Sequence, residues 1–126
     1  MLLLCRIRNS ILVIEVKQAV ARLIESDLAA YTCPVRCALL GGAKPEEEAD
    51  LLQAFKFSRH IPFERDDWRA AALLERQLRA KGLTVPRDDL FVATVAMRAG
   101  VVVTCRDAHF EAMRKMVGDR LKVEQV

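Results

Sequence analysis

The sequence predicts an α/β sandwich in which helices pack around a mainly parallel sheet. Short continuous apolar runs, typical of buried strands, alternate with longer stretches whose apolar residues recur at helical spacing. Prolines and glycines stand between these stretches, where helices usually begin and end. The chain has 126 residues, of which 52% are hydrophobic and 29% charged. This length and balance predict a single folded domain over residues 1–126.

The first half of the chain shows this alternation clearly. Ile11–Ile14 is a continuous apolar run that predicts a buried strand, and Val16–Leu28 carries an apolar stripe at helical spacing. Tyr31–Cys33 predicts a short extended link. Pro34–Gly42 predicts a helix, because proline suits its first turn and the glycine pair suits its end. Pro45 and the three glutamates after it predict the next helix, because acids are stabilised at a helix N-terminus.

The second half repeats the pattern. His60–Phe63 predicts a strand. Asp66–Gly82 predicts a long helix whose inward stripe begins at Trp68 and continues through alanine and leucine residues. The remaining predicted elements are a helix at Asp88–Arg98 closed by Gly100, a strand at Val101–Thr104, a helix at His109–Met116 and an edge strand at Leu121–Val126.

Charge and hydropathy exclude few functions. The net charge of +3 is compatible with nucleic-acid binding but does not argue for it. The apolar runs near the start, Met1–Cys5 and Ile11–Ile14, are too short to span a membrane. Basic residues follow the first run, whereas in a signal peptide they precede the apolar stretch. We therefore expect a soluble, cytoplasmic protein without a membrane association.

Two acids stand at opposite ends of a predicted helix-turn-strand unit. Asp89 opens the helix, and Asp107 follows the strand Val101–Thr104. Such a unit can fold both acids to the carboxyl end of a parallel sheet, where ligands bind. Converging carboxylates can hold Mg²⁺, which activates water and stabilises charge on a phosphate. From the residues alone a second interpretation stays open, in which Asp89 is an N-terminal helix acid and Asp107 a helix cap.

The residues around these acids follow one another in a recognisable order. A Lys-Gly pair, a proline, the acid-opened apolar helix, a glycine, an apolar strand and a second acid with an aromatic residue three positions later succeed each other. This order resembles the C-terminal half of PIN domains, and of VapC-type toxins in particular. The matching residues are Lys81, Gly82, Pro86, Asp89, Phe91–Ala96, Gly100, Val101–Val103, Asp107 and Phe110. The stretch from Cys33 to Ala43 is similar to the second helix of that family.

The resemblance implies a three-layer α/β/α PIN-like fold with a mainly parallel central sheet. It also implies an acidic pocket that binds Mg²⁺ or Mn²⁺ and cleaves RNA, with Asp89 and Asp107 as catalytic and metal-binding residues. For the toxins of the family it further implies a cognate VapB-like antitoxin and a homodimer.

Two positions depart from the family pattern. The family has a glutamate in its second helix, and Ala38 stands in the matching place. The family begins with a strand followed by Asp-Thr or Asp-Ser, and here two registers are open. In one, Asn9 takes the place of the acid. In the other, Glu15 follows Ile11–Ile14 and is the acid. The first 16 residues are thus an atypical start, and with fewer acids metal binding should weaken.

Two functions follow from these observations. The first is a VapC-like, metal-dependent endoribonuclease with a weakened acidic site, in which Arg87 and Arg106 steer the RNA backbone. The alternative is a catalytically inactive PIN-fold module that binds an antitoxin-like partner or RNA.

Cysteines and histidines are not expected to bind metal. The four cysteines, at positions 5, 33, 37 and 105, match no zinc-binding pattern and are expected to be buried, reduced thiols. His60 and His109 have no partner at metal-ligand spacing.

Overall fold

The computed structural model describes residues 2–4, 22, 25–26, 29–105 and 108–125. In this part of the chain, five strands form one sheet in the order β3-β2-β1-β4-β5, and each neighbouring pair is parallel. The predicted parallel sheet is therefore confirmed. The strands are β1 (Leu2–Leu4), β2 (Ala29–Tyr31), β3 (Arg59–His60), β4 (Val102–Cys105) and β5 (Lys122–Gln125).

The helices begin and end where local chemistry predicts. A proline stands in the first turn of α2, and Pro86 immediately precedes α5. Gly100 ends α5 in the left-handed conformation, with φ of 67°, which glycine adopts without steric cost. The helices are α2 (Cys33–Gly42), α3 (Glu48–Lys56), α4 (Arg65–Ala80), α5 (Arg87–Ala99) and α6 (Ala108–Val117), with short 3-10 turns at Pro45–Glu47 and Gly118–Arg120.

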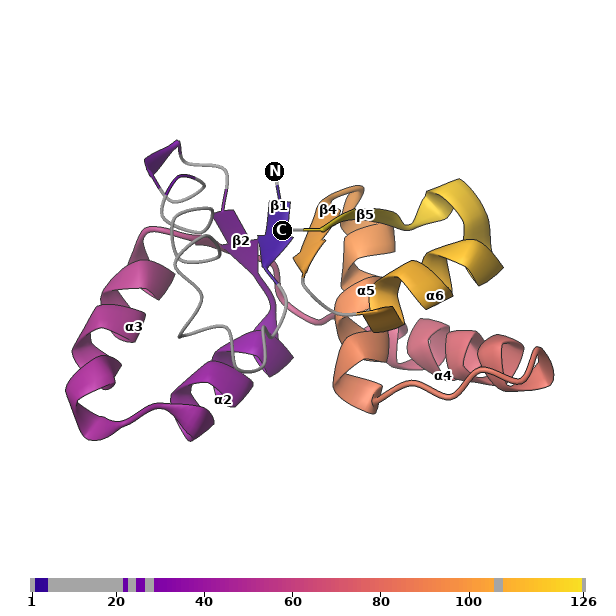
Figure 1. Ribbon diagram of the computed structural model, residues 1–126, viewed down its shortest axis with the longest axis horizontal. Coiled ribbons are helices and arrows are strands. Elements are labelled where there is room, and N and C mark those ends of the chain that lie inside the picture. The colour runs from indigo at the N-terminus through magenta and orange to yellow at the C-terminus, as the bar shows by residue number, and fades with distance from the viewer. Residues whose placement is uncertain (1, 5–21, 23–24, 27–28, 106–107, 126) are drawn as a thin grey trace.

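The strand order places the helices in two groups. Connections between parallel strands are right-handed, so those running toward β3 and those running toward β5 cover opposite faces of the sheet. Figure 1 shows α2 and α3 on one side of the strands and α4, α5 and α6 on the other. From β1 the chain adds strands toward β3, and it then crosses back to add β4 and β5 on the other side of β1. The switch point therefore lies between the neighbouring strands β1 and β4. In open parallel sheets, ligands bind at such a switch point.

Among the helices that the structure describes, α5 has the most buried residues. Leu90 and the five residues Val92–Ala96 are all buried. The helix contacts α2, α4, α6 and β4. Because packing holds it from several directions, α5 fixes the position of the acid in its first turn. The largest fully buried side chains around it are Phe110, Leu78, Met113 and Leu121.

The first strand differs from the prediction. The middle strand of the sheet is β1, formed by Leu2–Leu4, which the sequence pattern did not single out. The strand predicted at Ile11–Ile14 lies outside the described residues. Of the predicted link at Tyr31–Cys33, Tyr31 is the last residue of β2, Thr32 is the N-cap of α2, and Cys33 is the first residue of α2. The strand predicted at His60–Phe63 is shorter, because Pro62 has no N–H to donate to a neighbouring strand.

Trp68 is not part of the inward stripe of α4. Its exposed fraction is 60%, and its ring packs edge-on against those of Phe63 and Phe91, with centroids 4.6 and 5.3 Å away. The buried stripe begins one residue earlier, at Asp67. Neighbours on a helix point about 100° apart, so Trp68 faces away from the core. The stripe consists of Asp67, Ala71, Leu74 and Leu78.

The cysteines also differ in part from expectation. Cys105 in β4 is buried, as predicted. Cys33 and Cys37 are exposed, because they lie one turn apart on the outward face of α2, whereas Val35 faces the core.

Candidate functional site

Three helix N-termini gather at the carboxyl edge of the sheet. Helices α2 and α6 follow β2 and β4 and therefore begin at this edge. Helix α5 precedes β4 and runs back against it, so α5 also begins there. The first turns of helices carry unpaired N–H groups and a partial positive charge. This edge is therefore suited to carboxylates and phosphates.

Asp89 is the sheltered acid of this edge. It lies in the first turn of α5, and its side chain is 14% exposed. Its neighbour Asp88 is exposed, because adjacent helical residues point about 100° apart. Of the two acids that open α5, Asp89 is thus the one held against the other elements of the site.

His109 lies directly against Asp89. Its Nδ1 is 2.9 Å from Oδ2 of Asp89, and its side chain is 44% exposed. The two residues are 20 positions apart, in the first turns of α6 and α5. Sequence spacing alone did not single out His109. The sequence did offer one indication: His109 lies in the first helical turn after strand β4, and such turns meet at the carboxyl edge of a parallel sheet.

Two buried hydroxyl groups near this edge have no hydrogen-bond partner among the described residues. They belong to Thr32, the residue before α2, and to Thr104 in β4. Both side chains are at most 1% exposed. Buried hydroxyls normally find a partner, so these two are exceptions among the described residues.

Several predicted site residues cannot be placed. Asp107, Glu15, Asn9 and Arg106 lie outside the described residues, and their roles stay predictions. Ala38 is described, half-buried on α2, and has no atom that binds a metal. Within residues 29–105 and 108–125, no three His, Cys, Asp or Glu side chains are grouped closely enough to hold a metal ion. The described core of the site is one carboxylate and one imidazole.

A second histidine lies at the same edge. Nε2 of His60, at the end of β3, is 3.3 Å from Sγ of Cys33 at the start of α2. The His60 ring stacks on Tyr31 with a centroid distance of 5.0 Å. This pair is exposed and belongs to the β2–β3 side of the sheet, whereas Asp89 and His109 belong to helices that flank β4.

Two charged side chains in the first turns of α6 and α5 are paired with neighbours. Glu111, in the first turn of α6, accepts hydrogen bonds from Arg114, which hold the pKa of the Glu111 carboxyl below its usual value. Glu111 is therefore a charged acid already engaged by a cation. Arg87 at the start of α5 lies 3.6 Å from Glu75 and remains 76% exposed. Such exposed pairs are weak, so Glu75 does not hold Arg87 firmly.

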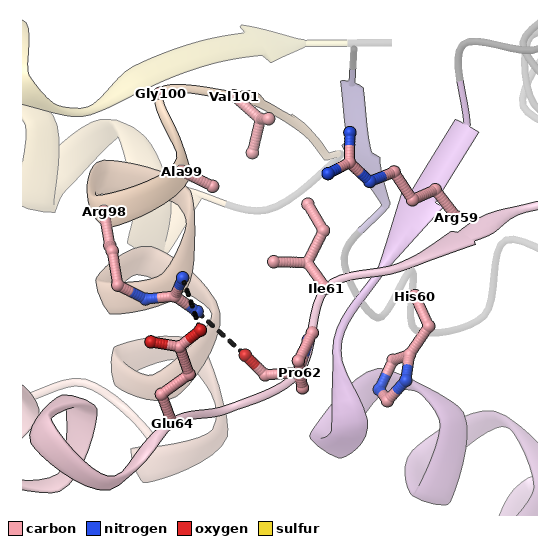
Figure 2. A pocket seen from close by; sticks show the side chains of 9 residues that line it. All are labelled: Arg59, His60, Ile61, Pro62, Glu64, Arg98, Ala99, Gly100 and Val101. Atoms are coloured by element: carbon pink, nitrogen blue, oxygen red, sulfur yellow. Dashed lines mark hydrogen bonds and ion pairs between the residues drawn. The ribbon is translucent and has the colours of Figure 1, made fainter.

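The hollow in Figure 2 lies where the end of α5 meets the loop before α4. Its volume is about 490 Å³, and none of its lining residues is a candidate acid. Arg98 donates to the carbonyl of Pro62 at 2.8 Å and lies 3.4 Å from Glu64. Arg98 thus joins the end of α5 to the loop before α4. The lining residues are Arg59, His60, Ile61, Pro62, Glu64, Arg98, Ala99, Gly100 and Val101.

Known structures share this fold. No protein-family model and no curated protein matches the chain. A chain of DNA-bound VapBC from Salmonella typhimurium is 18% identical with a TM-score of 0.73, and the match covers 99% of this chain and 98% of that one. A chain of VapBC2 from Rickettsia felis, bound to a promoter DNA fragment, gives 17% identity, a TM-score of 0.71 and the same coverage. A chain of FitAcB from Neisseria gonorrhoeae gives 17% identity and a TM-score of 0.68, covering 98% and 96%.

These likenesses extend over nearly the full length of both chains. The chain therefore has the PIN-like α/β fold of VapC-type proteins, as the sequence resemblance predicted. Among the described helices, none is long and apolar enough to cross a membrane.

Proposed function

We propose that this chain, which has the fold of VapC-type PIN domains, is a toxin of a toxin–antitoxin pair and a metal-dependent endoribonuclease. The observation that carries the proposal is the position of Asp89. It is a sheltered carboxylate at the switch point of a parallel sheet, where the N-termini of α5 and α6 meet. Solved VapBC complexes contain a chain with the same fold, which supports the toxin assignment.

The cofactor of the proposed reaction is Mg²⁺ or Mn²⁺, held by Asp89 and by Asp107. When bound, such an ion activates water and stabilises the charge that develops on a phosphodiester. Asp89 contributes an oxygen whose position is set by the packed helix α5. A ligand fixed in this way is already oriented before the substrate arrives. Glu15 is a further candidate ligand, from the start of the chain.

The RNA backbone would approach along the exposed start of α5. Arg87 is 76% exposed and two residues from Asp89, so it can attract a phosphate toward the acid. Arg106, next to Asp107 in the sequence, is proposed to do the same.

A VapB-like antitoxin is the proposed protein partner. The solved structures that this chain resembles are VapBC and FitAB complexes, which supports a partner of that kind. A homodimer and a cytoplasmic location also belong to the proposal.

The alternative function is a PIN-fold module that binds its partner or RNA without cutting. Ala38 favours this alternative, because a methyl group stands where a carboxylate would add a ligand. A site with fewer carboxylates holds a divalent ion less tightly.

Metal-dependent RNA cleavage by the pure protein tests the proposal. We expect cleavage with Mn²⁺ or Mg²⁺ and none with EDTA. Asp89→Asn and Asp107→Asn should each slow it by about 100-fold or more, the usual effect of losing one preorganised electrostatic group. Asp88→Asn is the matched control, because it removes the adjacent exposed acid, and it should cut at nearly the normal rate.

The outcomes separate the two functions. Unchanged cleavage by Asp89→Asn and Asp107→Asn would mean that the assigned site is wrong. A folded protein that never cuts RNA, but forms a stable complex with an antitoxin-like chain, would establish the alternative.

A further inference from the structure

We propose that Cys33 is a reactive thiol with His60 as its base, and that small-molecule disulfides modify it reversibly. The two residues come from α2 and β3, and the pair involves neither Asp89 nor His109. The inference therefore goes beyond the proposed nuclease function and does not depend on it. It gives a chemical role to two residues that sequence spacing did not connect.

The contact between the two side chains carries the inference. Nε2 of His60 is 3.3 Å from Sγ of Cys33, although the two residues are 27 positions apart in the sequence. In the tautomer that carries its proton on Nδ1, His60 accepts a hydrogen bond from the thiol. A thiol with a base in hydrogen-bond reach is the arrangement found in activated cysteine nucleophiles.

The core of the protein holds the His60 ring in place. The ring stacks on Tyr31, with centroids 5.0 Å apart and 19° between the two planes. Tyr31 is buried and packs in turn against Phe55, with centroids 4.8 Å apart. Activated nucleophiles commonly have a third group that orients the base. Tyr31 serves in that way here, because it keeps the His60 nitrogen beside the sulfur.

The position of Cys33 suits a reaction with a molecule from solution. Cys33 and His60 are both exposed, so a small disulfide can reach the sulfur. Cys33 is also the first residue of α2, and the partial positive charge at a helix N-terminus stabilises an anion there. Accessible cysteines beside a histidine or at a helix N-terminus are the ones that react most readily.

Cys37 provides an internal comparison on the same helix. It is exposed like Cys33, but the two histidines of the chain lie elsewhere, against Cys33 and Asp89. The two thiols are also poorly placed for a bond to each other. Residues four positions apart on a helix have Cβ atoms about 5–6 Å apart, whereas a disulfide needs about 3.5–4.5 Å. A group attached to Cys33 therefore stays until another thiol removes it.

The proposed step is a thiol–disulfide exchange. Nε2 of His60 accepts the thiol proton as Sγ of Cys33 attacks one sulfur of the small disulfide. A new S–S bond joins Sγ to that sulfur, and the original S–S bond breaks. The other half of the reagent leaves as a thiolate and takes the proton from His60. The Cys33 sulfur is oxidised and the departing sulfur is reduced, so excess thiol reverses the step.

Mapping of the modified cysteines tests the inference. The full chain is treated briefly with oxidised glutathione, its remaining thiols are blocked with N-ethylmaleimide, and its tryptic peptides are identified by mass spectrometry. Trypsin cleaves after Arg36, so Cys33 and Cys37 fall in different peptides. We expect Cys33 to gain glutathione at least about 10-fold faster than Cys37, less than the roughly 100-fold or more that a base in a sheltered active site contributes.

His60→Phe isolates the contribution of the base, because phenylalanine keeps a ring that can stack on Tyr31. The rate at Cys33 should fall to that of Cys37, and the rate at Cys37 should not change. Circular dichroism checks that the variant is folded. Adding excess reduced glutathione to the unmodified sequence after exchange should restore its original mass, and a mass that does not return would contradict the reversible step.

Three further results would overturn the inference. Equal rates at Cys33 and Cys37 in the natural sequence would do so without any variant. An unchanged Cys33 rate in a folded His60→Phe protein would exclude His60 as the base. Peptides joined through Cys33 and Cys37 would show that the two thiols bond to each other, so that the mixed disulfide does not persist. All of these measurements are independent of RNA cleavage, so their failure leaves the proposed function untouched.

Discussion

Arg98 and the buried carboxylate of Asp67 form an ion pair that joins the end of α5 to the start of α4. Nε of Arg98 is 2.9 Å from Oδ1 of Asp67, whose side chain is 4% exposed. Oδ2 of Asp67 also accepts a hydrogen bond from the backbone N–H of Glu64 at 2.8 Å. The same carboxylate thus caps the N-terminus of α4 and pairs with the positive charge of Arg98 near the end of α5. This pair holds the helix that carries Asp89 from the end opposite the acid.

Removing Arg98 should destabilise the protein strongly. Arg98→Ala leaves the buried Asp67 carboxylate without its cation, and breaking such a pair costs about 3 kcal/mol of unfolding free energy. Arg87→Ala is the matched control, because it removes an arginine that is 76% exposed beside Glu75. That change should cost less than about 1 kcal/mol. Urea denaturation measures both, and an equal loss in the two variants would contradict the role of the Arg98 pair.

Gly100 is required by the backbone that ends α5. Its φ is 67°, and a Cβ added at this position would meet no atom within 4 Å, so only the backbone conformation opposes a side chain. Gly100→Ala should therefore cost about 1 to 2 kcal/mol. Gly41→Ala, in the last turn of α2 with equally open surroundings, should instead stabilise by about 0.5 kcal/mol. Thermal unfolding of the two variants should shift in opposite directions, and a shared direction would argue against this account.

Trp68 should report on the surface of α4. It is the only tryptophan of the chain and is 60% exposed, so acrylamide should quench its fluorescence readily. The packing of its ring against Phe63 and Phe91 should restrict its motion, which fluorescence anisotropy measures. Weak quenching that becomes strong on dilution would show instead that a second copy covers Trp68 at higher protein concentration.

Adding a carboxylate at position 38 should strengthen metal binding. Ala38 lies three residues after the buried Val35, on the face of α2 that turns toward the rest of the molecule. Ala38→Glu should raise both Mn²⁺ affinity and the rate of RNA cleavage, because it adds an oxygen ligand. Cys37→Glu is the control, since it adds the same charge on the exposed face of α2. Equal gains in both variants would point to a general charge effect.

Local chemistry explains which elements were predictable from the sequence. The limits of α5 follow from Pro86 before it and Gly100 after it, and both effects act within a few residues. Strand β1 could not be recognised in the same way. Its three residues, Leu2–Leu4, are too few to show a period, and it is a strand because β2 and β4 pair with it on either side.

The sequence by itself determined the α/β alternation, the parallel sheet, the PIN-like order of residues and the place of Asp89 at the start of a helix. These depend on backbone preferences and on apolar spacing along neighbouring residues. Only the tertiary structure decided that His109 lies against Asp89, 20 residues away, and that Arg98 neutralises Asp67, 31 residues away. Such contacts depend on how α4, α5 and α6 pack around one another, and no local pattern of residues specifies that packing.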